Sequence, residues 1–340
     1  MTVRCGDTLL FQTLPVIAAG AAVGGKKESE GPLAAEFDEL SADNCFGQSS
    51  WEAAEKYLQL RAARLCLQKA ALPQEKVQLA LAGDLQAQCT ASSYAMRELG
   101  VPFAGLFGAC STMAEALGLG AALCSAGLAD GLLAMASSHF CTAERQFRTP
   151  LSYGAVRTPT AQWTATAAGA CLLRPAGQGV GIRAVTFGRV QDYQIRDINN
   201  MGAAMAPAAS ATLLHYLRDT HAEPPDFDAI YTGDLGHVGS QLFRELLAAE
   251  GLLIKNHVDC GCILYDANEQ AVKSGGSGAG CCAAVLCAHI LPRLERGTQK
   301  RVLFLATGAL MSQTTFLQKE SIPAVAHLVE LTAPEKGAAS

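Results

Sequence analysis

Apolar residues along the chain gather in short continuous runs, which alternate with longer stretches of helical spacing. Apolar side chains recur at helical intervals from residue 51 to about residue 71, so we expect a helix there with Ser50 as its cap. Residues 77–84 and 131–139 are almost uniformly apolar up to polar C-terminal ends, which is typical of buried strands. Residues 24–50 are polar and weakly patterned, so we expect them to form an exposed loop.

The second half of the chain repeats this plan. The strand expected at residues 227–235 ends in Gly-Asp-Leu and leads into a helical stretch, as residues 79–85 do in the first half. Residues 278–286 resemble residues 167–174, and we expect both segments to be strands. A last strand is expected at residues 301–308. Two similar series in the same order indicate an internal duplication.

We therefore expect an α/β fold with two halves, residues 1–178 and residues 179–340, in which helices cover the sheets. Ligands of such folds bind where the strands reach their carboxyl ends. The polar residues expected to converge there are Asp84, Cys110, His139 and Asp234.

Composition narrows the class of protein. Half of the 340 residues are hydrophobic and 17% are charged, so the chain can bury a full core. The net charge of -5 and the lack of Lys/Arg runs argue against a nucleic-acid partner. Thirteen irregularly spaced cysteines without a signal peptide indicate free thiols in a cytoplasmic-type compartment, and no cysteine pair has zinc-site spacing. The apolar stretch at 116–129 is too short to cross a bilayer and predicts a buried helix.

Cys110 is the strongest candidate for chemistry. It lies in Ala109-Cys110-Ser111, between a Gly-ended apolar run and a small-residue helix expected to reach about residue 125. The helix dipole and the unpaired N–H groups of a first turn favour a thiolate, which is the nucleophilic form of cysteine. The alternative is a buried structural thiol, and for the other twelve cysteines, including Cys281 and Cys282 within an expected strand, we expect that role.

Several segments together resemble a known family. They are residues 137–139, 150–154, 157–164, 232–235 and 275–278. In combination they are similar to the stage V sporulation protein AD family of the thiolase superfamily, from about residue 5 to about residue 330. Thr-Pro-Thr-Ala-Gln-Trp-Thr at 158–164 is the specific part, whereas Gly-Ala-Cys-Ser at 108–111 looks like the nucleophile segment of the whole superfamily.

The resemblance implies a thiolase-like fold, in which two duplicated α/β halves form a layered αβαβα architecture. It also implies a role in spore formation and germination, through binding of dipicolinate (pyridine-2,6-dicarboxylate) and its movement across the spore inner membrane. The implied partners are membrane-embedded proteins of the same sporulation operon, which would hold this chain peripherally at the inner membrane of the forespore or spore. Related folds usually form homodimers, so a homodimer is expected by analogy.

The sequence is compatible with two functions. The condensing enzymes that the chain resembles supply a His and an Asn from their second half, and these positions fall on residues 232–234 and 275–277. Asp234 stands near the first, and the second holds no Asn. Because a carboxylate repels developing negative charge, we expect a noncatalytic binding protein. The alternative is an acyl-CoA thioester-dependent acyltransferase or condensing enzyme, with Cys110 as nucleophile and His139 as its catalytic neighbour.

A planar dianion needs a cationic fork, hydrogen-bond donors and an apolar wall. Arg157 is the first choice for a carboxylate partner, with a surface ion pair as its alternative role. Asp84 and Asp234 would repel a bare dianion, so either calcium accompanies the ligand or these residues cap the helices that follow them. No other cofactor and no protein metal site is expected. The further ligand-binding candidates are Cys110, Ser137, Ser138, His139, Gln162, Trp163, Asp234 and Ser277.

Overall fold

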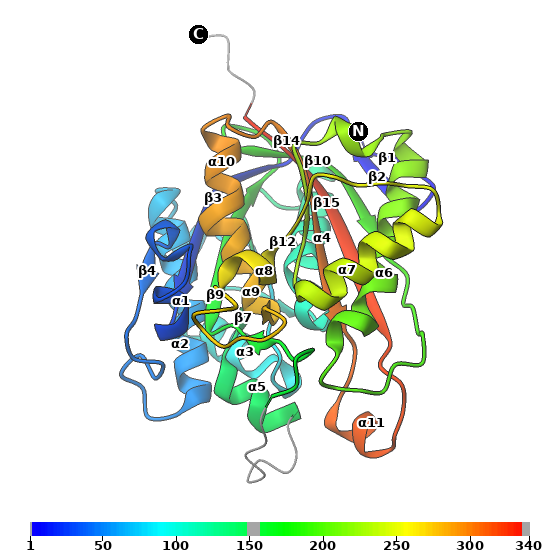
Figure 1. Ribbon diagram of the computed structural model, residues 1–340. Coiled ribbons are helices and arrows are strands. Elements are labelled where there is room, and N and C mark those ends of the chain that lie inside the picture. Colours follow the sequence, from blue (N-terminus) through cyan, green and yellow to red (C-terminus); the bar gives the residue numbers. More distant parts are fainter. Residues whose placement is uncertain (1, 148–156, 335–340) are drawn as a thin grey trace.

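The computed structural model describes residues 2–147 and 157–334, so the motif segment at residues 150–154 lies outside the described part (Figure 1). The first half contributes five main strands to the central sheet, in the order β3-β9-β7-β5-β6. β5, β6 and β7 run parallel, and β9 lies antiparallel between β7 and β3. Their bounds are β3 (Val16–Gly24), β5 (Leu79–Gly83), β6 (Phe103–Gly105), β7 (Leu132–Ser138) and β9 (Ala167–Arg174).

The second half has the same order and the same strand directions, β10-β15-β14-β11-β12. The two series meet where β10 pairs with β3. This match agrees with the expected duplication and with the correspondence of residues 227–235 to residues 79–85. The expected correspondence of residues 278–286 to β9 is wrong, because the counterpart of β9 is β15. The bounds are β10 (Val180–Phe187), β11 (Ala229–Thr232), β12 (His257–Asp259), β14 (Arg301–Ala309) and β15 (Ala324–Thr332). The N-terminal hairpin departs from the expected division into residues 1–178 and 179–340. It consists of β1 (Thr2–Cys5) and β2 (Thr8–Phe11), and β2 pairs with β10 of the second half.

Helices cover both faces and fill the space between the two series of strands. The first outer layer packs on the first half, the middle layer packs between the halves, and the second outer layer packs on the second half. Figure 1 shows α2 on one side of the molecule and α6 with α7 on the other. The result is the expected αβαβα architecture. In layer order the helices are α2 (Trp51–Lys69) and α3 (Thr90–Leu99), α4 (Thr112–Ser125) and α9 (Ala279–Val285), and α6 (Met201–Thr220) and α7 (Gly236–Ala249).

The remaining elements are short and connect these layers. Two of them, β8 and β13, pair with each other in a separate small parallel sheet next to the site described below. A π-helix at Leu286–Ile290 continues α9 into α10. The bounds are α1 (Lys26–Ser29), β4 (Glu39–Leu40), α5 (Phe140–Phe147), β8 (Trp163–Thr164), α8 (Cys260–Leu264), β13 (Gly276–Ser277), α10 (Leu291–Glu295) and α11 (Gln313–Leu317).

The prediction of a strand at residues 278–286 is wrong, because the chain forms α9 there. Its small residues let the helix approach the sheet closely. A Cβ on Gly280 would lie 2.1 Å from the carbonyl oxygen of Ala167, and one on Gly169 would lie 2.3 Å from that of Ala283. A short run that is apolar on every side carries no periodicity, so its pattern fits a buried helix as well as a buried strand.

The loop at residues 24–50 is less exposed than expected. Ser50 caps α2 as predicted, since its side chain accepts from the amide of Ala53 at 3.2 Å. Glu28, however, is fully buried, and its carboxylate accepts from the amide of Thr166 at 3.0 Å and from the hydroxyl of Tyr265. Burial raises the pKa of Glu28. The loop is therefore attached to both halves of the chain.

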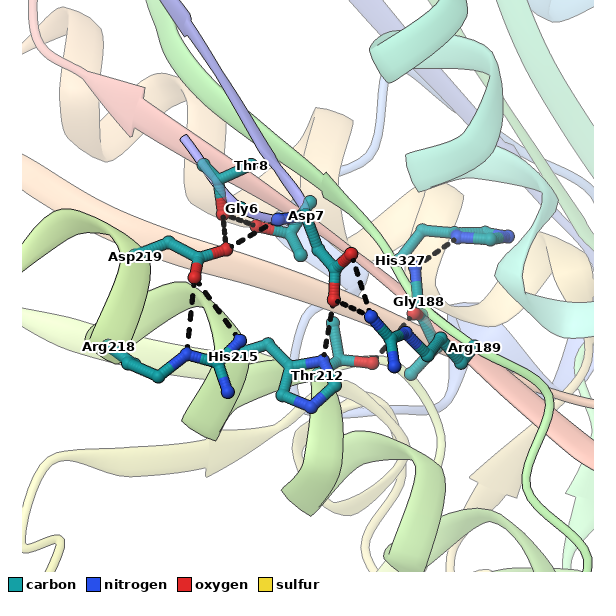
Figure 2. A network of polar contacts seen from close by, with 12 residues as sticks. Gly6, Asp7, Thr8, Gly188, Arg189, Thr212, His215, Arg218, Asp219 and His327 are labelled. Carbon is teal, nitrogen blue, oxygen red and sulfur yellow. Dashed lines mark hydrogen bonds and ion pairs between the residues drawn. The ribbon is translucent and has the colours of Figure 1, made fainter. Parts of the chain in front are cut away.

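A polar network attaches the N-terminal hairpin to the second half (Figure 2). Asp7, in the turn of the hairpin, forms an ion pair with Arg189 at 2.9 Å, and its carboxylate lies 3.1 Å from Nδ1 of His215. Asp219 accepts from the amide of Asp7 at 2.8 Å and from the hydroxyl of Thr8 at 3.1 Å. The network thus fixes the start of the segment that leads from β10 to α6.

In the described residues, no helix combines the length and the apolar character that a membrane span requires.

Candidate functional site

A cavity of about 450 Å³ lies where the carboxyl ends of strands from both halves meet. Its size is within the usual range for small-molecule sites. Its polar lining includes Asp84, Cys110, Glu144, Arg157, Gln162 and Ser277. The apolar wall includes Phe107, Phe147, Met201, Met205, Leu310 and Met311.

Cys110 lies in a tight turn that opens into this cavity. Ala109 has a φ of +50°, which is a strained conformation for a residue with a Cβ. β14 comes so close behind the turn that a Cβ on Gly308 would lie 2.2 Å from the carbonyl oxygen of Gly108. The turn therefore holds Cys110 in place at the cavity, with 8% of the residue exposed.

The expectation of a thiolate at Cys110 is wrong. Burial, together with the neighbouring carboxylate of Asp234, raises the pKa of the Cys110 thiol well above its usual value. Asp234 is fully buried and is not part of the cavity lining. It accepts from Thr307 Oγ1 at 2.7 Å, Ser277 Oγ at 2.9 Å and the amide of Gly278 at 3.1 Å. Desolvation and a nearby carboxylate outweigh the helix dipole here.

The alternative role expected for Asp234 was to cap the helix that follows it. The structure does not show this role for Asp234. That role belongs to Asp259, whose carboxylate accepts from the amides of Leu235 and Gly236, each at 2.9 Å. Asp84 does hold the start of α3, because it accepts from the amide of Ser92 at 2.8 Å. Asp84 also borders the cavity, so its capping role and its place at the site coexist.

Arg157 borders the cavity in an ion pair with Glu144, with 2.8 Å between Nη1 and Oε1. Its Nη2 donates to the carbonyl oxygen of Gln162, and its Nε is buried without a partner. The guanidinium lies over the rings of Phe140 and Trp163, 5.5 and 5.3 Å from their centroids. The surface ion pair considered as an alternative is thus present, but at the wall of the cavity.

Gln162 presents an unsatisfied acceptor at the same wall. Its Nε2 donates to the carbonyl oxygens of Asp234 at 2.6 Å and Gly276 at 2.9 Å. These two acceptors fix the orientation of the amide. Its Oε1 is buried without a hydrogen-bond partner and belongs to a residue that is 9% exposed. Two residues of the cavity wall, Arg157 and Gln162, therefore each hold one buried polar atom without a hydrogen-bond partner.

Four further candidate residues also lie away from the cavity wall. Two of them are serines: Ser137 donates to Glu55 at 3.2 Å, and Ser138 donates to the carbonyl oxygen of Ala165 at 2.7 Å. Both serines are fully buried. The third, Trp163, stacks on Phe140, with ring centroids 3.8 Å apart, so its predicted role as a flat face for the ligand is not supported.

The fourth, His139, is a buried structural histidine and does not reach Cys110 as a catalytic neighbour. Its Nε2 lies 2.9 Å from the carbonyl oxygen of Asn44, and its Nδ1 accepts from the amide of Cys141 at 3.1 Å. These two contacts assign a neutral ring with its proton on Nε2. Burial lowers the pKa of His139, which also favours the neutral form.

Comparison with known proteins places this architecture and this sequence in one family. The family model described as Stage V sporulation protein AD (SpoVAD) matches residues 5–332. The chain is 40% identical over 322 residues to "Stage V sporulation protein AD" of Bacillus subtilis (strain 168), covering 94% of this chain and 95% of that protein.

The chain belongs to the stage V sporulation protein AD family. The segment at 157–164 that carried the resemblance supplies four residues of the cavity wall, Arg157, Ala161, Gln162 and Thr164. Glu144 and Thr307 were not predicted as site residues. Nothing in the sequence pattern marks either one, because their roles depend on partners from distant segments.

Solved structures show the fold that the family shares. A variant of OleA from Xanthomonas campestris is similar with a TM-score of 0.61 at 15% identity, over 95% of this chain and 99% of that chain. The 3-oxoacyl-[acyl-carrier-protein] synthase III of Aquifex aeolicus VF5 is similar with a TM-score of 0.56 at 12% identity, over 94% and 99%. The fold is therefore thiolase-like.

Proposed function

We propose that this chain is a noncatalytic sporulation protein that binds dipicolinate in the cavity beside Cys110, and thereby takes part in dipicolinate uptake into spores or its release from them. Membership of the family supports the sporulation role. The observation that carries the binding proposal is Arg157, a guanidinium at the wall of a cavity of about 450 Å³. Guanidinium groups are well suited to carboxylates, and the apolar wall suits an aromatic ring.

The state of Cys110 supports binding over catalysis. A buried thiol whose pKa is raised is a poor nucleophile. Asp234 adds negative charge where an enolate or oxyanion would need stabilisation. In this proposal Cys110 and Ser277 contribute polar surface to the pocket, and Gln162 contributes its amide oxygen.

We propose that calcium enters with dipicolinate. The charged residues in the described lining are Asp84, Glu144 and Arg157, so a bare dianion would meet more negative than positive charge. Calcium binds carboxylate and amide oxygens, which both the ligand and this wall possess. Among the residues that the structure describes, no three His, Cys, Asp or Glu side chains are grouped to hold a metal ion.

We further propose that the protein works at the spore inner membrane through membrane-embedded partners from the same operon, and that it forms a homodimer. Among the described strands, β6 is an edge strand that pairs with β5 alone, so its other edge would be the place where a second copy pairs. Light scattering tests the dimer. Co-purification of the tagged chain with membrane fractions from sporulating cells that have or lack the operon tests the partners.

Calorimetry of the purified protein tests the binding proposal. We expect saturable heat with dipicolinate at one site per chain, and tighter binding with calcium present. Absence of heat, together with absence of competition at millimolar ligand, would count against dipicolinate as the ligand. A crystal soaked with dipicolinate should show density between Cys110 and Arg157.

One observation favours the alternative, an acyl-CoA thioester-dependent enzyme. Cys110 sits in a strained turn at a cavity, as a nucleophile would. Incubation with acetyl-CoA followed by intact-mass measurement separates the two functions. We expect no adduct, whereas an acyl group on Cys110 that a nucleophile discharges would establish the enzyme.

A further inference from the structure

Two nitrogens of the Arg157 guanidinium, Nη1 and Nη2, already donate to acceptors of the protein. Glu144, from α5, accepts from its Nη1 at 2.8 Å. The carbonyl oxygen of Gln162 accepts from its Nη2. Both members of the ion pair line the cavity, and each side chain is 18% exposed. A ligand carboxylate must therefore share Arg157 with a carboxylate of the protein.

We propose that Glu144 is a specificity-determining residue that makes binding of a dicarboxylate depend on a divalent cation. This inference rests on the proposed function. Glu144 competes with the ligand for Arg157, so a doubly negative ligand binds well only when a cation offsets its charge. The protein then prefers the metal chelate of a planar dicarboxylate over the free dianion.

The charges around Arg157 support this role. Asp84 borders the same cavity, and its carboxylate accepts from Ser92 and Gln86 instead of pairing with Arg157. A free dianion would add two negative charges to this wall, whereas its one-to-one complex with a divalent cation adds none. The unpartnered amide oxygen of Gln162 gives such a cation a further ligand.

A second role for Glu144, that of merely holding Arg157 in position, makes the opposite prediction. Arg157 has other contacts that hold it, namely the carbonyl oxygen of Gln162 and the stacked rings of Phe140 and Trp163. Glu144→Gln keeps an oxygen for Nη1 and removes only the charge. The substitution therefore separates competition from positioning.

The experiment is calorimetry with dipicolinate, in metal-depleted buffer and with added CaCl₂, on wild type, Glu144→Gln and Glu52→Gln. Glu52 is the matched control, because it pairs with Arg145 of the same helix α5 at 2.8 Å, and neither residue lines the cavity. We expect Glu144→Gln to bind free dipicolinate about tenfold more tightly than wild type, with a smaller gain from calcium. Glu52→Gln should match wild type.

Isophthalate gives an independent arm, because it carries the same two carboxylates without the ring nitrogen that completes a chelate. Its binding should also strengthen in Glu144→Gln. Glu144→Asp, which keeps the charge, should keep the calcium dependence of wild type. Thermal unfolding of each variant verifies that it is folded before titration.

Three outcomes would contradict either the role of Glu144 or the proposed function. If Glu144→Gln binds dipicolinate more weakly than wild type and the ratio of affinities with and without calcium is unchanged, Glu144 only positions Arg157 and the inference is wrong. If wild type binds dipicolinate equally well with and without calcium, the inference is also wrong while the proposed function stands. If wild type binds in neither buffer, the proposed function itself fails.

Discussion

The carboxylate of Asp234 raises the pKa of the Cys110 thiol, and both residues are buried at the junction of the two halves. The raised pKa keeps Cys110 a protonated side chain in the wall of the cavity. The carboxylate is held by donors from β13 and β14, so it cannot turn away from the thiol without losing them. Its position is therefore part of the fold.

Asp234→Asn should increase the reactivity of Cys110. Removal of the neighbouring charge lowers the pKa of the thiol, so its alkylation by iodoacetamide at pH 8 should accelerate several-fold. The amide nitrogen can face the hydroxyl of Thr307, which leaves the other hydrogen bonds in place. Peptide mass mapping measures the modification residue by residue. The buried Cys66 is the internal control, and an unchanged rate at Cys110 would contradict the assigned role of Asp234.

Arg157→Ala should weaken dipicolinate binding more than Cys110→Ala does. A hydrogen bond to a charged group contributes about 1.5–3 kcal/mol, so the loss at Arg157 should reach about tenfold to about a hundredfold in Kd. Cys110 offers only a weak S–H donor, and its replacement should cost less than about threefold. Calorimetry under one buffer condition ranks the two. The opposite order would overturn the pocket described above.

The stability of the protein should fall as pH rises from about 5 to 8, in part through Glu55. Glu55 is buried beside Asp84, and burial together with that charge raises its pKa from 4.5 to about 8. Between these values the folded protein keeps a proton that the unfolded chain releases, so the contribution of Glu55 to the free energy of unfolding decreases with pH. Urea unfolding at several pH values measures this slope.

Glu55→Gln should flatten that slope and should be more stable than wild type at pH 8. The amide fits the site, because its oxygen can accept from Thr142 and Gln86 while its nitrogen donates to Ser137. The control is Glu98→Gln, an exposed residue paired with Lys56. Parallel profiles for wild type and Glu55→Gln would show that Glu55 does not hold the proton.

Gly308→Ala should destabilise the protein and weaken ligand binding together. Its Cβ would lie 2.2 Å from the carbonyl oxygen of Gly108, so the turn that holds Cys110 must shift. Overpacking of this kind costs about 1–3 kcal/mol. The matched control is Gly105→Ala, where the nearest atom is a ring carbon of Phe103 at 3.4 Å. Equal effects of the two substitutions on urea unfolding and on calorimetry would argue against the turn as a fixed element of the site.

The pattern of apolar and polar residues along the chain was sufficient to predict many of the helices and strands. The strand predicted at residues 167–174 is β9, with the same bounds, and the helix predicted to begin after Ser50 is α2. The pattern failed at residues 278–286, because a run of small apolar residues is compatible with a helix wherever the neighbouring sheet leaves room for one. The error concerned the type of the element and not its burial.

The sequence by itself determined the family, the repeated α/β plan and the place of Cys110 at a turn, since these depend on the order of residues along the chain. The tertiary structure alone decided that Cys110 keeps its proton and that Arg157 forms an ion pair with Glu144. It also decided that His139 is a buried structural residue. The physical reason is that protonation and charge pairing depend on burial and on neighbours from distant segments. Those neighbours meet only when the layers pack.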